Sequence, residues 1–147
     1  SEIHAAIGSV QIKKLPDFLK IRKNNFLVLE KYFKDIPGFT VLSEPSNEHL
    51  ESCYYCLGAL LDERLISRRP EIIRHLNKLG VGSSVYYPQP VPRMKYYKDK
   101  YGYNKNLYPI ASYISDGIIA FPVGPHLDVN DMETIAKEVK ILMEKII

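Results

Sequence analysis

Apolar residues near the N-terminus recur at the spacing of one helix face. The first stripe consists of Ile3, Ala6, Ile7 and Val10. A second stripe runs from Phe18 to Phe33, after Pro16. Because proline disfavours helical backbone in the residue before it, the pattern predicts two helices with a break near Leu15 and Pro16. Pro37 and Gly38 are expected to end the second helix.

Two further helical stripes have clear boundaries. Pro70 is placed for a first helical turn and Gly80 follows the last apolar position, so we expect a helix between them. Asp128 is a helix-capping residue type and precedes the clearest stripe of the chain. That stripe consists of Met132, Ile135, Ala136, Val139, Leu142, Met143 and Ile146. A shorter helix is expected from Pro109 to Ser115.

Short apolar runs between polar or turn-forming residues predict strands at residues 40–42, 54–61, 81–87 and 117–121. Prolines at 88, 90 and 92 exclude regular structure over that stretch, because they remove backbone donors. The order of elements predicts an α/β or α+β fold, in which helices pack on a small antiparallel or mixed sheet. No repeat or long linker divides the chain, so we expect residues 1–147 to form a single domain.

The composition is that of an ordinary globular chain. Twenty Lys and Arg against 17 Asp and Glu leave a formal charge of only +3, which by itself indicates little about partners. No apolar run reaches the roughly 20 residues that a bilayer requires, and no signal peptide opens the chain. We therefore expect no membrane partner and a cytoplasmic location. The chain begins at Ser1 and enters a helical pattern at once, so we expect that an upstream segment has been removed.

Catalytic and metal-binding motifs are absent or weak. Cys53 and Cys56 form a C-x-x-C pair, but no second ligand pair exists, so we interpret both as structural. The four histidines show no ligand spacing, and no nucleophile elbow occurs. Gly80 and Gly82 follow a helix and lead into a predicted strand, the reverse of a dinucleotide-binding loop. The sequence therefore predicts no catalytic, cofactor-binding or metal residue in this chain.

Residues 92–106 concentrate positive charge among aromatic rings. Five basic residues and one acidic residue give this stretch a net +4, interleaved with four tyrosines. Rings that stack on bases and cations that neutralise phosphates would suit single-stranded nucleic acid. The alternative is a solvated excursion whose tyrosines pack back on the domain. The pI of about 8.7 lies below the value of about 9 that is usual for such domains, so nucleic acid is the weaker interpretation and a smaller anion stays open.

Three segments resemble one family. The opening SEIHAAIGSVQIKKLPDFLKIRKNNF resembles the helix that begins the C-terminal part of DegT/DnrJ/StrS-type sugar aminotransferases. The stretch LNKLGVGSSVYYPQPVPRMKYY is similar to the family's later helix, strand and proline-rich turn. PIASYISDGIIAFPVGPHLDVNDMETIAKEV resembles its closing segment and final helix. The resemblance spans the whole chain.

The resemblance implies the small C-terminal domain of a fold-type-I pyridoxal-phosphate enzyme. Such enzymes move an amino group, usually from glutamate, onto a nucleotide-linked keto sugar, and they share the active site across a homodimer. In the family, the Schiff-base lysine and the acidic partner of the pyridine nitrogen lie upstream of the segment that matches Ser1. We therefore expect this chain to bind no pyridoxal phosphate and to be inactive without a large domain. The resemblance does not separate a transaminase from the related dehydratases.

The resemblance also indicates which residues contact substrate. By the family match, the turn that holds Tyr86, Tyr87 and Gln89 faces the sugar nucleotide. Tyr86 stands where many relatives have histidine, and its phenol either donates to a sugar or phosphate oxygen or packs on the domain. Arg93 and Lys95 are candidates for phosphate contact, since a guanidinium fork matches phosphate oxygens.

Three functions stay open. The leading hypothesis is the aminotransferase domain, the second is a free-standing binding or interaction module, and the weakest is nucleic-acid binding through residues 92–106. Under the first, the stripe of Ile3, Ala6, Ile7 and Val10 lacks its partner surface, so we expect an exposed apolar patch.

Overall fold

A three-stranded antiparallel sheet forms the centre of the structure, a computed structural model that describes residues 1–43, 49–104 and 107–147. The strands, in their order across the sheet, are β1 (Phe39–Val41), β2 (Cys56–Leu61) and β3 (Ile118–Pro122). In the register, Val41 lies opposite Ala59, and Leu57 lies opposite Phe121. The expected α+β class is confirmed, and the sheet is antiparallel rather than mixed.

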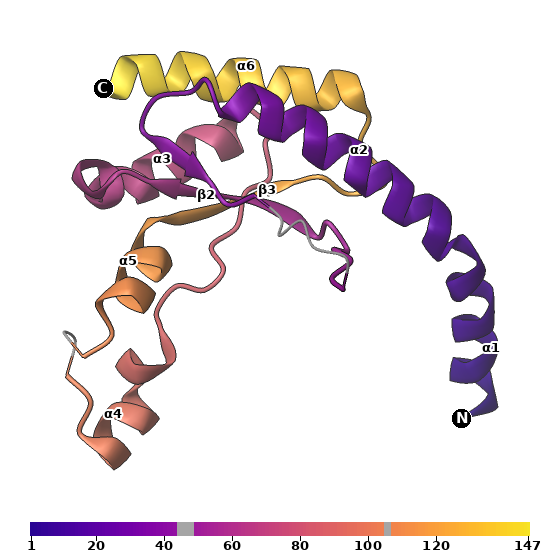
Figure 1. Ribbon diagram of the computed structural model, residues 1–147, viewed down its shortest axis with the longest axis horizontal. Helices are drawn as coiled ribbons and strands as arrows, with labels where there is room; N and C mark the ends of the chain where they lie inside the picture. The colour runs from indigo at the N-terminus through magenta and orange to yellow at the C-terminus, as the bar shows by residue number, and fades with distance from the viewer. Residues whose placement is uncertain (44–48, 105–106) are drawn as a thin grey trace.

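Helices cover one face of the sheet and form the core with it. Helices α2 (Leu15–Phe33) and α6 (Val129–Ile146) pack side by side there, and α3 (Arg69–Lys78) contacts α6 (Figure 1). Leu57, Ala59 and Leu61 are fully buried because alternate residues of β2 face this layer. Phe33 and Phe121 meet edge to face, with ring centroids 4.7 Å apart. The aromatic contact joins α2 to β3 across the core.

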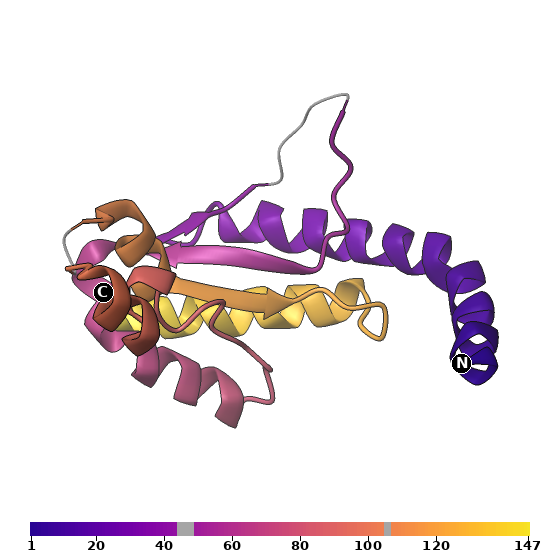
Figure 2. The ribbon, with the colours of Figure 1, turned by 90° about the horizontal axis from the view of Figure 1, so that it is seen from below.

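Two short helices lie on the other side of the sheet. Helix α5 (Pro109–Gly117) contacts β2, and α4 (Lys95–Tyr101) lies farther from the body of the protein (Figures 1 and 2). Short 3₁₀ helices cover Ile12–Lys14, Glu63–Arg68 and Val91–Arg93. The last of these leads through Met94 into α4, so the proline-rich segment connects the sheet edge to the projecting helix.

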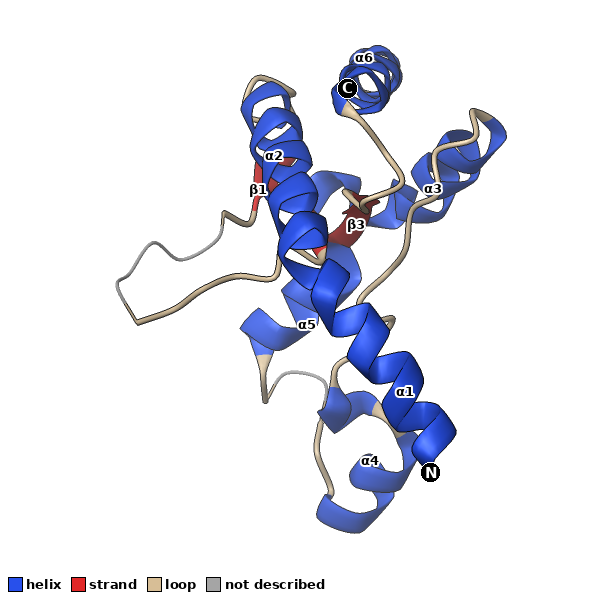
Figure 3. Ribbon diagram, turned by 90° about the vertical axis from the view of Figure 1, so that its right-hand side faces the viewer, coloured by secondary structure: helices blue, strands red, loops and turns tan. Residues whose placement is uncertain are grey.

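Helix α1 (Glu2–Gln11) projects beyond the body of the structure at the end away from α4 (Figure 1), and in Figure 3 it extends from α2 clear of the sheet. None of its residues is buried. The predicted exposure of its apolar stripe is confirmed, with Ile3 at 73% and Ile7 and Val10 each at 55% of their full accessible surface. These side chains therefore contribute little to the stability of the described fold.

The predicted break between the first two helices lies slightly earlier than expected. The chain passes through the 3₁₀ turn Ile12–Lys14 and resumes as α2 at Leu15. Pro16 stands in the first turn of α2, where its missing N–H removes no helical hydrogen bond. The proline therefore starts the second helix, and the change of direction precedes it.

The predicted strand at residues 81–87 is wrong. Only Ser84 pairs with the sheet, in one antiparallel bridge with Ala120. The Ser84 N–H donates to the Ala120 carbonyl at 3.0 Å, and the Ala120 N–H donates back at 2.8 Å. Glycine and serine around this bridge have weak strand propensity, and the prolines that follow cannot donate to a ladder. The chain therefore leaves the edge of β3 after a single pair.

The closing helix is confirmed, including its cap. The Asp128 carboxylate accepts from the Asp131 N–H at 3.0 Å, and the Asp131 carboxylate accepts from the Asp128 N–H at 2.9 Å. This reciprocal pair satisfies two backbone donors at the start of α6. Helix α4 was not predicted, because its seven residues carry no apolar stripe.

Candidate functional site

Tyr86 and Tyr87 lie where the chain turns away from β3. The buried Ser115 of α5 holds this turn, since its Oγ donates to the Tyr87 carbonyl oxygen at 2.7 Å. The Tyr87 side chain is 71% exposed, and its ring lies 5.8 Å from that of Tyr86. The backbone of the turn is thus fixed, while the Tyr87 phenol is presented to solvent.

Arg93 is tied to α5 by an ion pair. Its Nη2 lies 2.5 Å from an Asp116 carboxylate oxygen. Nearby, Arg69 donates from Nη1 to the carbonyl oxygens of Ser115 and Ile118. Burial lowers the pKa of Arg69, the Asp116 charge opposes this, and the Arg93 charge lowers it further. A phosphate that contacts Arg93 would have to share this guanidinium with Asp116.

Lys95 and Gln89 are fully on the surface. Lys95 Nζ lies 2.5 Å from an Asp99 carboxylate oxygen one helical turn away. The Gln89 side chain is exposed. The structure therefore brings Tyr86 and Tyr87 together near α5, but gives both predicted cations a carboxylate partner.

The tyrosines of residues 92–106 form a continuous chain of ring contacts that extends to Tyr108. The rings of Tyr96, Tyr97, Tyr101, Tyr103 and Tyr108 follow one another with centroids 5.1 to 6.3 Å apart. Lys100 Nζ lies over two of these rings and donates to the Tyr96 hydroxyl at 3.1 Å. Lys105 of the predicted basic stretch lies outside the described residues. The described part of this segment packs largely on itself.

A second group of aromatic and basic residues lies beside Tyr86, and the sequence did not predict it. The Tyr55 ring lies 6.0 Å from that of Tyr86, and the Arg22 guanidinium lies 5.9 Å from the centre of the Tyr55 ring. We call these three residues the Arg22–Tyr55–Tyr86 cluster. The hydrogen bond with Tyr86 raises the pKa of the Tyr55 phenol, and the charge of Arg22 opposes the rise. The cluster joins three segments that are remote in sequence.

One signal in the sequence points to Arg22. It stands four residues before Phe26, on the stripe that continues through Leu29 and Phe33 into the core. A helical stripe of this kind predicts an apolar residue at that position. The arginine at the end of the stripe is therefore a departure from the pattern that sequence reasoning could have noticed.

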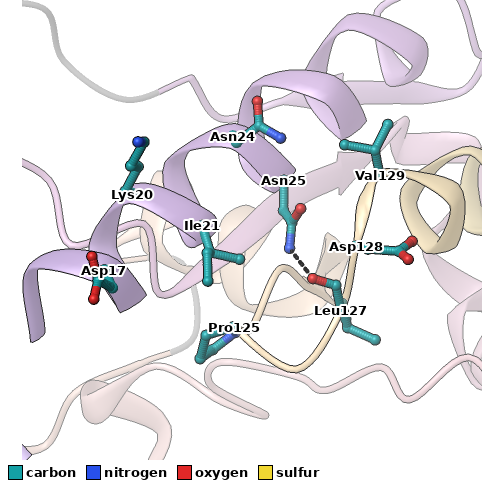
Figure 4. Close-up of a pocket in the computed structure, with 9 residues that line it drawn as sticks. All are labelled: Asp17, Lys20, Ile21, Asn24, Asn25, Pro125, Leu127, Asp128 and Val129. Atoms are coloured by element: carbon teal, nitrogen blue, oxygen red, sulfur yellow. Dashed lines mark hydrogen bonds between the residues drawn. The ribbon is translucent and has the colours of Figure 1, made fainter. Parts of the chain in front are cut away.

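A hollow of about 560 Å³ lies elsewhere, between α2 and the segment that precedes α6. Figure 4 shows the Asn25 amide reaching across its floor to the Leu127 carbonyl, a hydrogen bond of 2.9 Å. The rim carries Asp17, Lys20 and Asp128, and the Asp128 carboxylate already caps α6. No residue of the predicted substrate site lines this hollow.

Possible metal ligands in the described ranges do not cluster, and the lysines there lie on the surface. Across these ranges, no three His, Cys, Asp or Glu side chains gather as metal ligands would. A Schiff-base lysine needs an environment that favours its neutral form, as burial does, whereas every lysine in the described ranges is exposed. None of the helices there combines the length and apolar composition needed to cross a bilayer.

Comparison with known proteins gives consistent matches. Residues 1–140 match the sequence model of the DegT/DnrJ/EryC1/StrS aminotransferase family. The chain is 28% identical over 145 residues to the dTDP-4-amino-4,6-dideoxy-D-glucose transaminase of Escherichia coli, which covers 99% of this chain and 38% of that enzyme.

Solved structures agree with the sequence matches. A putative sugar aminotransferase of Streptococcus pneumoniae, in its PMP form, matches with a TM-score of 0.88 and 26% identity, over 100% of this chain and 36% of that one. PseC of Helicobacter pylori, an aminotransferase involved in the biosynthesis of pseudoaminic acid, matches with a TM-score of 0.84 and 25% identity, over 98% and 38% of the two chains. The chain thus spans well under half the length of the relatives it matches.

Proposed function

We propose that this chain, which belongs to the DegT/DnrJ/EryC1/StrS aminotransferase family, is the small C-terminal domain of a pyridoxal-phosphate-dependent sugar aminotransferase. The parent enzyme would transfer an amino group, from glutamate, to a keto sugar carried on a nucleotide. One observation carries the proposal: almost the whole chain matches sugar aminotransferases in both sequence and fold, over 36–38% of their length. Pyridoxal phosphate would be held by residues of a large domain.

In this proposal, the turn around Tyr87 forms one wall of the substrate site. The Ser115 hydrogen bond fixes the backbone of the turn, so the exposed phenol has a defined position from which to donate to a sugar or phosphate oxygen. Gln89 extends the same surface with an amide. Arg93 and Lys95 would attract the nucleotide's negative charge, although each is also held by a carboxylate. These residues bind and orient, and the proposal gives none of them a step in the chemistry.

The exposed apolar face of helix α1 supports the proposal that this chain packs against a further domain. Its exposed isoleucines and valine lie apart from the core of the described fold. Apolar side chains gathered on one helix face commonly mark an interface. We propose that the large domain of the parent enzyme covers this face, and that the assembled enzyme is a homodimer.

The test is to supply a large domain. The E. coli relative, truncated to remove the part that this chain matches, is co-expressed with this chain, and amine transfer from glutamate to a nucleotide-linked keto sugar is measured by mass spectrometry. Amine transfer is expected only when both chains are present. The matched control is the truncated relative with the Ile7→Asp form of this chain, which should restore little or no transfer.

A second function is favoured if the two chains fold and associate but transfer no amine. The chain would then be a free-standing binding or interaction module that has kept the family fold. The exposed face of α1 is the feature that supports this alternative.

A further inference from the structure

Arg22 lies at the boundary between the core and the surface. It continues the buried stripe of α2 by one turn beyond Phe26, at the end where Tyr54 packs edge to face on the Phe26 ring, with centroids 5.3 Å apart. Its Nε is buried and has no hydrogen-bond acceptor in the described part of the chain. A buried N–H without an acceptor costs free energy, so this position favours a ligand that brings an acceptor oxygen, as an anion does.

Arg22 differs from the other arginines in that its guanidinium contacts the Tyr55 ring but no described carboxylate or carbonyl. Arg68 and Arg93 form ion pairs at 3.0 and 2.5 Å, and Arg64 forms one at 3.9 Å. Arg69 and Arg74 donate to backbone carbonyls. Among the described residues, Arg22 is the one arginine with neither an ion pair nor a hydrogen bond.

The surroundings of Arg22 supply further donors and positive charge. The Tyr55 and Tyr86 rings lie 6.0 Å apart, and each carries a phenol O–H that can donate to a ligand. Lys23, the next residue along α2, lies 5.9 Å from the centre of the Tyr54 ring and makes no ion pair with a described carboxylate. Arg22 and Lys23 thus each lie against a tyrosine ring of the segment that precedes β2.

We propose that the Arg22–Tyr55–Tyr86 cluster is a binding site for a phosphate group of an anionic ligand. A guanidinium offers a planar fork of N–H donors that matches phosphate oxygens, and the phenol adds a donor from a second direction. A phosphate group has more oxygens to accept these donors than a carboxylate has, and it carries more charge. Because Tyr86 belongs both to this cluster and to the proposed substrate wall, a nucleoside diphosphate is one source of the phosphate, and free inorganic phosphate is the other.

The site rests on the proposed function only for the identity of its ligand. Phosphate binding is measured on this chain alone, whereas the proposed function is measured by amine transfer in the two-chain assembly. Pyrophosphate binding that requires Arg22, together with a failure of amine transfer, would therefore refute the proposed function and leave the site standing.

The experiment titrates this chain with inorganic pyrophosphate, uridine diphosphate and L-glutamate, while the NMR signals of the arginine Nε–H and tyrosine rings are followed. Saturable shifts are expected at Arg22, Tyr55 and Tyr86 with both phosphate compounds and not with glutamate. Tighter binding of uridine diphosphate than of pyrophosphate would identify a nucleotide as the source. Equal affinities would identify a free phosphate.

Three substitutions test the residues. Arg22→Gln should weaken pyrophosphate binding at least ten-fold, and Tyr55→Phe should weaken it several-fold. The matched control is Arg74→Gln, which removes an exposed arginine on α3 and should leave the affinity unchanged. If Arg22→Gln does not fold, Arg22→Lys replaces it, because a lysine keeps the charge and loses the fork, so the affinity should still fall.

Three results would overturn the site. The first is a folded wild-type chain that shows no saturable shift with either phosphate compound. The second is an equal loss of affinity in Arg22→Gln and Arg74→Gln, which would indicate a general charge effect. The third is glutamate binding as tight as that of pyrophosphate at the same residues.

Discussion

Some of the contacts between distant segments of this structure are made by polar residues, which the apolar pattern of the sequence does not identify. Asn25 is buried on α2, although it stands among polar residues in the sequence, and its amide joins α2 to the segment before α6. Periodicity cannot identify such a residue, because its partners are backbone carbonyls about a hundred positions away. The same limit applies to the Arg22–Tyr55–Tyr86 cluster, whose members come from three segments. The family resemblance selected Tyr86 and Tyr87, but only the folded chain places Arg22 against Tyr55, whose ring contacts that of Tyr86.

Replacement of Asn25 tests whether its amide stabilises the contact between α2 and the segment before α6. Asn25→Ala leaves the carbonyls of Gly124 and Leu127 without their amide donor, at 3.3 and 2.9 Å in the native chain, and removes buried contacts. The free energy of unfolding in urea should fall by about 2 kcal/mol, the size expected when buried polar groups lose a partner. Asn24→Ala, an exposed neighbour on the same helix, serves as the control and should change it by less than about 0.5 kcal/mol. Equal effects of the two substitutions would refute the role of the Asn25 amide.

The phenol pair gives a prediction about pH. The hydrogen bond with Tyr86 raises the pKa of Tyr55, so Tyr86→Phe should return that pKa toward its ordinary value. Because the folded-state pKa is raised, the stabilisation from the pair is present below the ordinary tyrosine pKa and is lost as pH rises through the raised value. Titration of the tyrosine ring signals by NMR measures both effects. Tyr113→Phe, which removes a hydroxyl that donates to the Leu61 carbonyl, should leave the Tyr55 pKa unchanged.

At the scale of elements, the long helices were predictable, whereas one predicted strand was wrong and one short helix was missed. A long helix carries enough apolar positions and boundary residues to identify itself, as the stripe and capping box of α6 show. A short edge strand depends on what lies beside it. Residues 81–87 were predicted as a strand from their apolar side chains, but only Ser84 meets Ala120 before the chain turns away. Helix α4 was missed because it carries no apolar stripe. Its tyrosines contact one another instead of facing the core.

Substitution of two glycines that follow helices distinguishes the cost of backbone strain from the cost of overpacking. Gly38 and Gly80 both have positive φ, at 84° and 78°. A Cβ at Gly38 would lie 2.7 Å from Leu65 and 2.9 Å from Met143, whereas one at Gly80 would meet nothing within 4 Å. Gly80→Ala should therefore cost about 1 kcal/mol of unfolding free energy from strain alone, and Gly38→Ala about 3 kcal/mol, because overpacking adds to the strain. The free energy of unfolding of each variant is measured in urea or by heating. Equal losses of this free energy in the two variants would show that overpacking at Gly38 adds nothing to the strain.

The whole molecule has one compact core and two projecting parts. Helix α1 projects at one end and α4 at the other, while α2, α6 and the sheet enclose the buried side chains (Figure 1). The apolar stripe of α1 was predicted to be exposed from its pattern and the family resemblance, and it is. The net charge of +3 also has a location, since residues 92–106 contain +4 and the remaining residues sum to −1. The exposed apolar stripe thus lies on α1, and the excess positive charge of the sequence lies in and around α4.

Substitution on α1 tests whether its exposed face is an interface. Ile7→Asp should change the free energy of unfolding of this chain by less than about 0.5 kcal/mol, because the side chain is 55% exposed and outside the core. The same variant should fail to co-sediment with the large domain of the E. coli relative. Ile110→Asp, at a 75% exposed position on α5, is the matched control and should associate normally. Normal association of Ile7→Asp would show that α1 is not the contact surface.

The role of the Tyr87 turn as a wall of the substrate site is tested most directly by the Michaelis constant of the two-chain enzyme for its nucleotide sugar. Tyr87→Ala should raise this KM at least five-fold and leave the KM for glutamate unchanged, because in the proposed site the exposed phenol contacts only the sugar nucleotide. Tyr96→Ala, a comparably exposed tyrosine on α4, should change neither constant. If Tyr87→Ala left both constants unchanged, or raised both equally, this face of the chain would not be the wall of the substrate site.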